Sequence, residues 1–375
     1  MSKTSILGVA LAILGLGQQG LPGSEPGLVA LPGNADADGG AQDAAPSLVQ
    51  QGLKALWGGS PSSVVYGGCP AVCWKEGCGL FADFLYLRPS NDQVPVAVPI
   101  NGAIVPPPGS APVQAGETAI ADLGFVPAFR VGGWWGLDEC ARIGIAYTRF
   151  EGASHVATAV SAPIVLRSLV SHPGTFAAPT DFLDAAATQD IGFQLADVDY
   201  RRIWWTGDRY LVHYVLGARY AHLGQTFDST LSNSTTVETV NTHLRFDGAG
   251  LRLGLGGERH AACSGWMIYG AAAASFLGGV SGGDYLQRNS TAAVDPLVIN
   301  SWSDDRLVPI LELEAGIGWT SQSGCFRVKA GYLVTSWFNV PTTENCIRAV
   351  HQNRTTGMED TLTFDGLDLR CELHF

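Results

Sequence analysis

The stretch LDLRCELHF, residues 367–375, alternates between two kinds of side chain. Leucine, cysteine and phenylalanine occupy the odd positions, whereas aspartate, arginine, glutamate and histidine occupy the even positions. Since successive side chains of a strand point to opposite faces, this period of two predicts a β-strand with one apolar and one charged face. The apolar face is that of Leu367, Leu369, Cys371, Leu373 and Phe375.

The same period of two recurs upstream. Residues 311–319 place Glu312 and Glu314 opposite an apolar face, and residues 326–334 do the same with Arg327 and Lys329. A barrel in a membrane turns its apolar face to lipid and carries aromatic residues near the strand ends. A soluble barrel fills its interior with the apolar set instead. The aromatic strand ends favour the membrane arrangement.

The composition narrows the fold class. The chain is 46% hydrophobic but only 15% charged, and it contains 47 Gly and 10 Trp. Soluble domains are about one quarter charged, yet no window here reaches the ~18 apolar residues of a spanning helix. Two fold classes fit this composition: a transmembrane barrel and a large soluble all-β protein. The net charge of −12 disfavours a nucleic-acid partner, which requires a basic face.

Ten strands are expected, joined alternately by short turns and by long polar or Pro-rich loops. This layout predicts an all-β fold, an antiparallel transmembrane β-barrel of about ten strands (8–12), with short periplasmic turns and long extracellular loops. A soluble β-sandwich is the alternative. The expected strands are Leu80–Arg88, Gly124–Gly136, Cys140–Gly152, Gln189–Trp205, Arg209–Leu223, Thr242–Gly257, Cys263–Gly279, Arg306–Trp319, Gly324–Asn339 and Thr361–Phe375. The expected loops are Pro89–Leu123, Ala153–Thr188, Gly224–Asn241, Val280–Asp305 and Val340–Asp360.

The N-terminal residues read as an export signal. Lys3 supplies the positive charge, and Ile6–Leu16 is an apolar segment of fitting length. We expect residues 1–37 to be a signal peptide and leader, residues 38–78 a partly disordered, cysteine-containing periplasmic segment, and residues 79–375 the barrel. The expected localisation is the bacterial outer membrane.

Six sequence blocks carry a family resemblance. They are ADFLYLRP (82–89), GFVPAFRVGGWWGL (124–137), LGARYAHL (216–223), FDGAGLRLGL (246–255), AGYLVTSWFN (330–339) and FDGLDLR (364–370). Together they resemble the Legionella-type pore-forming outer-membrane protein family, in the form found in planctomycete-like bacteria, over Phe81–Phe375. The resemblance implies a pore-forming β-barrel of the outer membrane, with no catalytic residues to carry over.

An aromatic residue closing an amphipathic final strand resembles the signal read by the barrel assembly machinery. We therefore expect Phe375, in register with Leu373 and Leu369, to face lipid and that machinery. Outer-membrane lipids and the assembly machinery are the expected partners, and the oligomeric state is left open.

No enzyme motif stands out. The sequence contains neither G-x-S-x-G nor H-E-x-x-H, and the glycines at 248, 250, 254 and 256 miss the dinucleotide-loop spacing. We expect no catalytic residue, metal or cofactor. Eight cysteines in an exported chain favour disulfides over zinc. The disulfide candidates, all expected at the rim of the short turns, are Cys69, Cys73, Cys78, Cys140, Cys263 and Cys325. Cys346 lies in a long loop and should lie at the opposite rim.

Charged residues on the expected inward faces are the candidate site. Buried charge is costly unless it is solvated or paired. We expect Glu312 and Glu314 to pair across strands with Arg327 and Lys329. The pore-lining candidates are Arg130, Arg142, Asp197, Asp199, Arg201, Arg219, Arg252, Glu312, Glu314, Arg327, Lys329 and Arg370.

These charges leave two functions open. One is passive diffusion of small hydrophilic solutes or ions through a pore whose lining sets selectivity. The other is a closed barrel, filled by an ion-pair network, with a structural or surface-binding role. About ten strands lie between the filled eight-stranded barrels and the wide sixteen-stranded porins.

Overall fold

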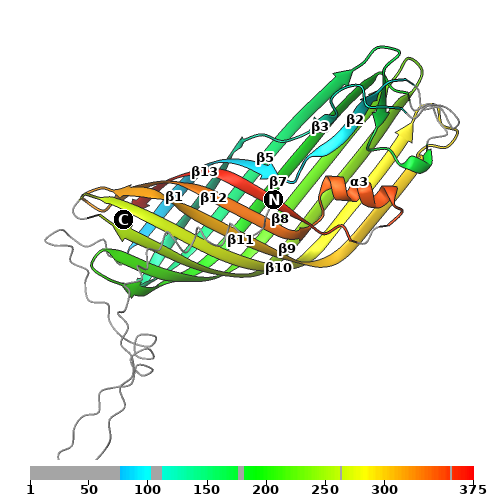
Figure 1. Cartoon of the computed structure of the whole chain (residues 1–375). Coiled ribbons are helices and arrows are strands. Elements are labelled where there is room, and N and C mark those ends of the chain that lie inside the picture. Colours follow the sequence, from blue (N-terminus) through cyan, green and yellow to red (C-terminus); the bar gives the residue numbers. More distant parts are fainter. Residues whose placement is uncertain (1–76, 103–111, 176–180, 262–263, 355–356) are drawn as a thin grey trace, which may run out of the picture. The chain divides into compact units, whose positions relative to one another are not determined.

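Ten antiparallel strands close into a barrel in the computed structural model, which describes residues 77–102, 112–175, 181–261, 264–354 and 357–375 (Figure 1). The ring closes because β1 pairs with both β13 and β4. Closure removes the free strand edges that a lipid environment does not tolerate. The ring is β1 (Cys78–Ser90), β13 (Asp360–His374), β12 (Phe326–Val340), β11 (Val298–Thr320), β10 (Trp266–Asn289), β9 (Val237–His260), β8 (Tyr210–Ser232), β7 (Asp184–Thr206), β5 (Ala141–Ala159) and β4 (Val126–Asp138).

All ten expected strands are present, but the long loops were partly wrong. Strands β7 to β11 are 23 or 24 residues long, about twice what spanning the membrane needs. The expected loop Gly224–Asn241 consists of the end of β8, a tight turn and the start of β9. In these extensions the strands remain paired, but their outward side chains are polar. The alternation of apolar and polar residues that predicted the strands is therefore lost there.

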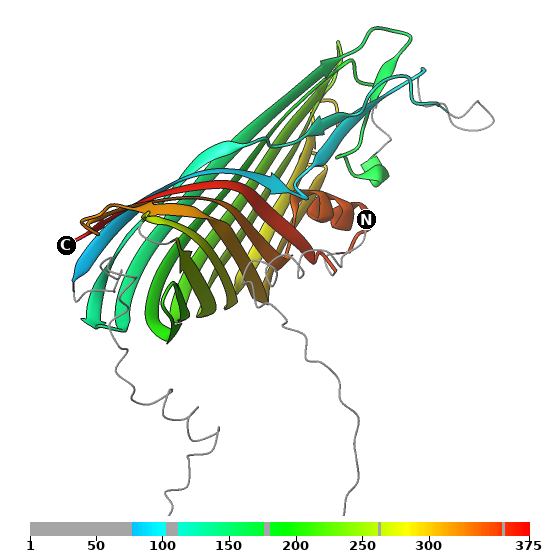
Figure 2. The same ribbon diagram turned by 60° about the vertical axis from the view of Figure 1, so that its left-hand side comes forward.

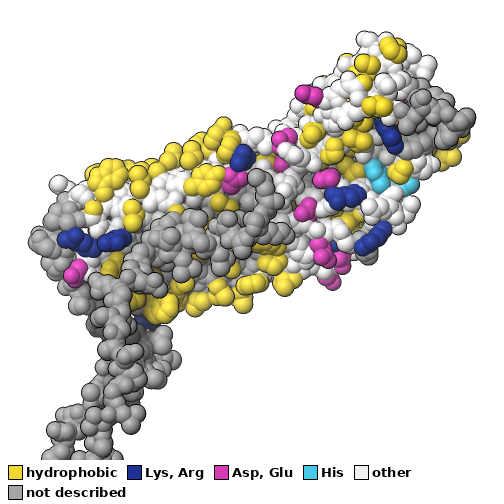
Figure 3. Space-filling view, viewed as in Figure 1, with side chains coloured by type: hydrophobic (Ala, Val, Ile, Leu, Met, Phe, Trp, Pro, Cys, Tyr) yellow, Lys and Arg dark blue, Asp and Glu magenta, His cyan; other side chains and the backbone are white. Residues whose placement is uncertain are grey.

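Two bands of outward aromatic residues mark the limits of an apolar belt. Between them, outward positions carry exposed Leu, Ile and Val, as the hydrophobic band in Figure 3 shows. Aromatic girdles at both interfaces are characteristic of transmembrane barrels. The band near the short turns contains Trp135, Trp204, Trp205, Tyr210, Trp266, Trp319, Phe326 and Phe375. The other band contains Tyr86, Phe125, Phe129, Tyr220, Phe276, Tyr332 and Phe338.

The short turns gather at one rim. They join β4 to β5, β7 to β8, β9 to β10 and β11 to β12. Cys140 and Cys325 lie at these turns, as expected, and Cys346 is buried at the other end of the barrel. None of the described cysteines forms a disulfide in this structure, and a bond among Cys78, Cys140 and Cys325 stays a prediction. Cys69, Cys73, Cys263 and the export signal lie outside the described residues.

A small cap fills the end opposite the short turns (Figure 2). It comprises a three-stranded sheet of β3 (Ala119–Ala121), β2 (Val94–Ile100) and β6 (Val165–Ser168), the 3-10 turn η1 (Pro173–Thr175) and helix α3 (Thr343–His351). Its apolar side chains, among them Val96, Leu166 and Ile347, share one core with inward residues of the long strands, including Phe227 and Tyr285. The cap therefore covers the inner face of the strand extensions.

Residues at both ends stabilise helix α3. Thr342 caps the helix by accepting a hydrogen bond from the Asn345 N–H, and Glu344 lies in the first turn with Arg348 in the last. Within the part of the chain that the structure describes, no helix has the length and hydropathy needed to cross a membrane.

Asp92 is a buried carboxylate at the base of the cap. It follows β1, and neither of its carboxylate oxygens has a hydrogen-bond partner of normal geometry within the described residues. Burial, and next the neighbouring Asp122, raise the pKa of Asp92 to about 6. A raised carboxyl pKa means that the folded chain prefers the protonated form. The Asp92 carboxyl therefore makes its full contribution to the free energy of unfolding below pH 4, and this contribution is lost as the pH rises through 6.

We predict that Asp92→Asn stabilises the protein at pH 7.5 by about 1–2 kcal/mol, since it removes a buried charge that accepts no hydrogen bond of normal geometry. At pH 4 the gain should largely disappear, because Asp92 is then neutral in the folded state. Thermal unfolding in detergent at the two pH values measures this. The exposed Asp208→Asn serves as the control, and a gain of equal size at both pH values would contradict the assignment.

Candidate functional site

The twelve charged residues expected in the lumen all lie on barrel strands, on the face turned away from the apolar belt. They are joined there by Asp83, Glu258, Asp368 and Glu372, which were not among the candidates expected from the sequence. The alternating pattern of the final strand could have identified Asp368 and Glu372, because both share the even-numbered face of β13 with Arg370.

Arg219 is the centre of one ion-pair group. Its guanidinium donates to both carboxylate oxygens of Asp197, at 2.6 and 2.7 Å, and its Nη2 lies 2.9 Å from Glu312. Arg252 also contacts Glu312, at 3.0 Å, and reaches Asp199 at 2.6 Å. Residues from β7, β8, β9 and β11 thus meet across the lumen.

A second group surrounds Asp83 on β1. Arg370 donates to both of its carboxylate oxygens at 2.8 Å, and Arg130 Nη1 lies 3.3 Å away. Arg130 also lies 3.8 Å from both Glu314 and Asp368. The bidentate geometry with Arg370 is the stronger kind of charged contact.

The third group lies nearer the short turns. Glu258 contacts Arg327 and Lys329, each at 3.2 Å, and Glu372 lies 3.2 Å from Lys329. The three groups connect strands that are not neighbours in the ring, so the charges contact one another through the barrel interior.

The expected pairing of Glu312 and Glu314 with Arg327 and Lys329 was wrong. Glu312 lies opposite Thr335, and Lys329 lies opposite Gly318. The turn between β11 and β12 offsets the two pairs of charges along the strands, so each finds partners across the lumen instead.

The charges in this half of the lumen balance. Among the described residues between the short turns and the middle of the barrel, eight cations and eight carboxylates face inward, without a ring of a single sign. The cations are Arg130, Arg142, Arg201, Arg219, Arg252, Arg327, Lys329 and Arg370. The carboxylates are Asp83, Asp197, Asp199, Glu258, Glu312, Glu314, Asp368 and Glu372. Arg142 also lies over the Trp134 ring, 5.2 Å from its centroid.

Small residues make room for these groups. A Cβ at Gly256 on β9 would lie 2.4 Å from Cε1 of His213, so the imidazole occupies the space that a side chain would need. A Cβ at each of the other glycines on this face, at 248, 250 and 254, would also meet neighbouring atoms, so these glycines are packing positions and not a phosphate loop.

An apolar layer crosses the whole lumen on the side of the charged groups that is farther from the short turns. Its aromatic centre is formed by Phe150, Phe193, Phe364 and Trp337, with ring centroids between 4.7 and 5.8 Å apart. All ten strands contribute at least one buried side chain to it. The layer contains Leu85, Leu87, Ala128, Phe150, Ile191, Phe193, Leu195, Ala221, Leu223, Phe246, Leu277, Val308, Ile310, Leu333, Trp337, Leu362 and Phe364.

The described residues offer no metal centre, because no three His, Cys, Asp or Glu side chains among them are placed to hold an ion.

A closed ring with an outward apolar belt, two aromatic girdles and an ion-paired interior defines a transmembrane β-barrel. Residues 70–375 match the family model described as "Legionella pneumophila major outer membrane protein precursor". The chain belongs to this Legionella major outer membrane protein family.

Comparison with solved structures returned outer-membrane proteins of low similarity. The Pseudomonas putida toluene transporter TodX is 6% identical over 80% of this chain and 89% of its own, with a TM-score of 0.26. The transport unit of the autotransporter AIDA-I from Escherichia coli is 6% identical over 87% and 97%, also with a TM-score of 0.26. At these scores the likeness carries no argument, and the fold rests on the strand pairing itself. A search of curated sequences returned no match.

We predict that Arg219→Met destabilises the barrel by about 3–5 kcal/mol, because it leaves buried carboxylates without their cation. The double variant with Asp197→Leu should recover part of this loss. Heat-modifiable gel migration and thermal unfolding in detergent measure both. Arg149→Met, which removes an exposed pair with Glu151, should change the stability of the barrel much less, because water screens an exposed ion pair. Equal effects of the two single variants would show that the lumen is wet.

Proposed function

We propose that this protein is a closed outer-membrane barrel that anchors and displays its cap at the cell surface, and that it does not act as an open pore. One observation carries the proposal: the apolar layer receives buried side chains from all ten strands. Apolar side chains packed across a lumen leave no continuous path of polar groups for a hydrated ion or solute.

The charges support the same proposal. Selective pores present rings of one sign to the solute, whereas the half of this lumen near the short turns holds equal numbers of both signs, paired at short distances. Passive diffusion of small solutes, the function implied by the family resemblance, stays a prediction. It requires the aromatic centre of the layer to open. We assign no catalytic role to the chain.

The protein refolded into planar bilayers should show no steady conductance. Combining Phe193→Ala and Trp337→Ala should raise conductance or membrane leak, because these changes remove the centre of the layer. Outward Phe338→Ala, in the girdle, is the matched control. Stable single-channel openings of the unaltered protein would overturn the closed-barrel proposal.

Assembly into the membrane is a separate proposal, and it concerns Phe375. This residue is 71% exposed on the lipid-facing side of the short-turn rim, and its N–H donates to the Cys78 carbonyl. Deleting Phe375 should lower the amount of protein inserted in cells several-fold without changing refolding in detergent. Phe326→Ala, at the same rim, should have little effect. Normal outer-membrane levels of the deletion would remove Phe375 from the assembly signal.

A further inference from the structure

The outer wall of the barrel carries a hollow that belongs neither to the lumen nor to the apolar belt. Its volume is about 400 Å³, within the range of small-molecule sites. It lies over β5, β7 and β8, where Gly192 and Gly224 face each other across neighbouring strands. A Cβ on Gly224 would meet only Nε2 of His222, at 3.8 Å, so the space above the glycine is open.

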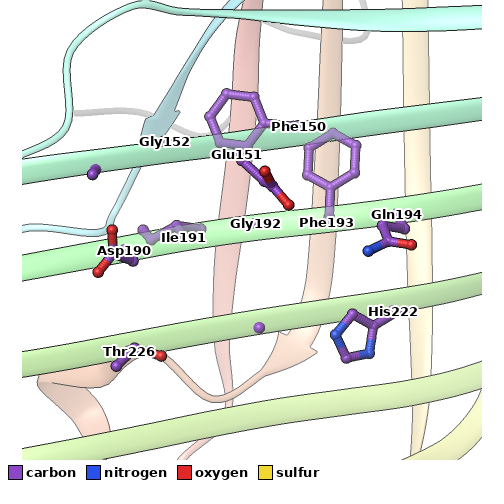
Figure 4. Close-up of a pocket in the computed structure, with 12 residues that line it drawn as sticks. Phe150, Glu151, Gly152, Asp190, Ile191, Gly192, Phe193, Gln194, His222 and Thr226 are labelled. Carbon is purple, nitrogen blue, oxygen red and sulfur yellow. The ribbon is translucent and has the colours of Figure 1, made fainter.

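Polar side chains frame the glycine pair on three sides (Figure 4). Gln194 and His222 face each other one register step closer to the belt, and Asp190 and Thr226 face each other one step farther from it. Glu151 closes the β5 side, opposite Gly192.

The free hydrogen-bonding groups of the hollow include both donors and acceptors. Gln194 Oε1 accepts from Tyr147, which leaves its amide N–H groups to donate. His222 Nδ1 contacts Asp247 at 2.8 Å, which leaves Nε2 facing the hollow. Within the described residues, Asp190 makes neither a hydrogen bond nor an ion pair. A ligand that both donates and accepts hydrogen bonds satisfies such a set.

The charge of the hollow excludes a phosphate as its main ligand. Two carboxylates, Glu151 and Asp190, line it, and no Lys or Arg does. Arg149, the nearest cation on β5, is already paired with Glu151. Hydroxyl groups of a sugar suit this lining, because they donate to carboxylates and accept from amides.

The position of the hollow indicates where such a sugar comes from. The Tyr147 hydroxyl contacts Gln194, and Tyr220 lies two positions before His222 on the same face of β8. These tyrosines flank the belt at the end away from the short turns. The hollow therefore lies at the level of the headgroups of the outer leaflet.

We propose that this hollow binds the sugar headgroup of an outer-leaflet glycolipid. The acyl chains lie along the belt below, and the glycine pair allows the sugar ring to approach the strand backbones. The proposal depends on the orientation of the barrel and not on whether its lumen is closed.

The test uses the full chain reconstituted in phosphatidylcholine vesicles with equal amounts of glucosyl-diacylglycerol and phosphatidylglycerol. Native mass spectrometry after brief detergent extraction counts the retained lipids. The unaltered protein should retain the glycolipid about tenfold over phosphatidylglycerol, the equivalent of about 1.4 kcal/mol. Gly224→Phe, which fills the hollow, should bring this ratio close to one.

Gly278→Phe is the matched control, because it adds the same ring at an outward glycine with open space on β10 and should keep the preference. Asp190→Ala removes an acceptor without filling the hollow and should weaken the preference, which keeps the test valid if Gly224→Phe does not fold. An unchanged ratio in both hollow variants, or stronger retention of phosphatidylglycerol, would overturn the proposal. Displacement of the glycolipid by free maltose would overturn the lipid source.

Discussion

A ring of ten paired strands is too narrow to leave its inward side chains without contacts, and this constraint shapes the rest of the molecule. Closure between β1 and β4 satisfies the backbone in the lipid environment. Once the ring is closed, charged side chains from strands that are not neighbours in the ring approach to within hydrogen-bonding distance. Burying them is tolerable only because they are paired, as Arg219 is with Asp197 and Glu312.

The lumen is organised in layers along its axis. The balanced charges lie nearer the short turns, the apolar layer follows, and the cap closes the other end. The cap is possible because β7 to β11 extend beyond the belt and give it an inner face to pack against. The cost of this layered filling is visible at Asp92, where a carboxylate is buried without a hydrogen-bond partner of normal geometry.

The outer wall has its own division of roles. The belt contacts lipid through Leu, Ile and Val, and the girdle tyrosines contact polar groups just beyond it, as Tyr220 does with Asp247. The polar hollow begins at this boundary. The inner and outer faces of the same strands can therefore serve different roles, because alternate residues never share a face.

The sequence by itself determined the barrel class, the ten strands and which charges face inward, because strict alternation is a local property that each strand carries alone. It could not determine the strand extensions, since polar residues outside the belt look the same in a loop and in a strand. Only the tertiary structure decided which charges pair. Glu312 finds Arg219 and Arg252 across the lumen, and not Arg327 on the next strand, because register and ring closure bring distant strands together. The same closure decided that the lumen is filled.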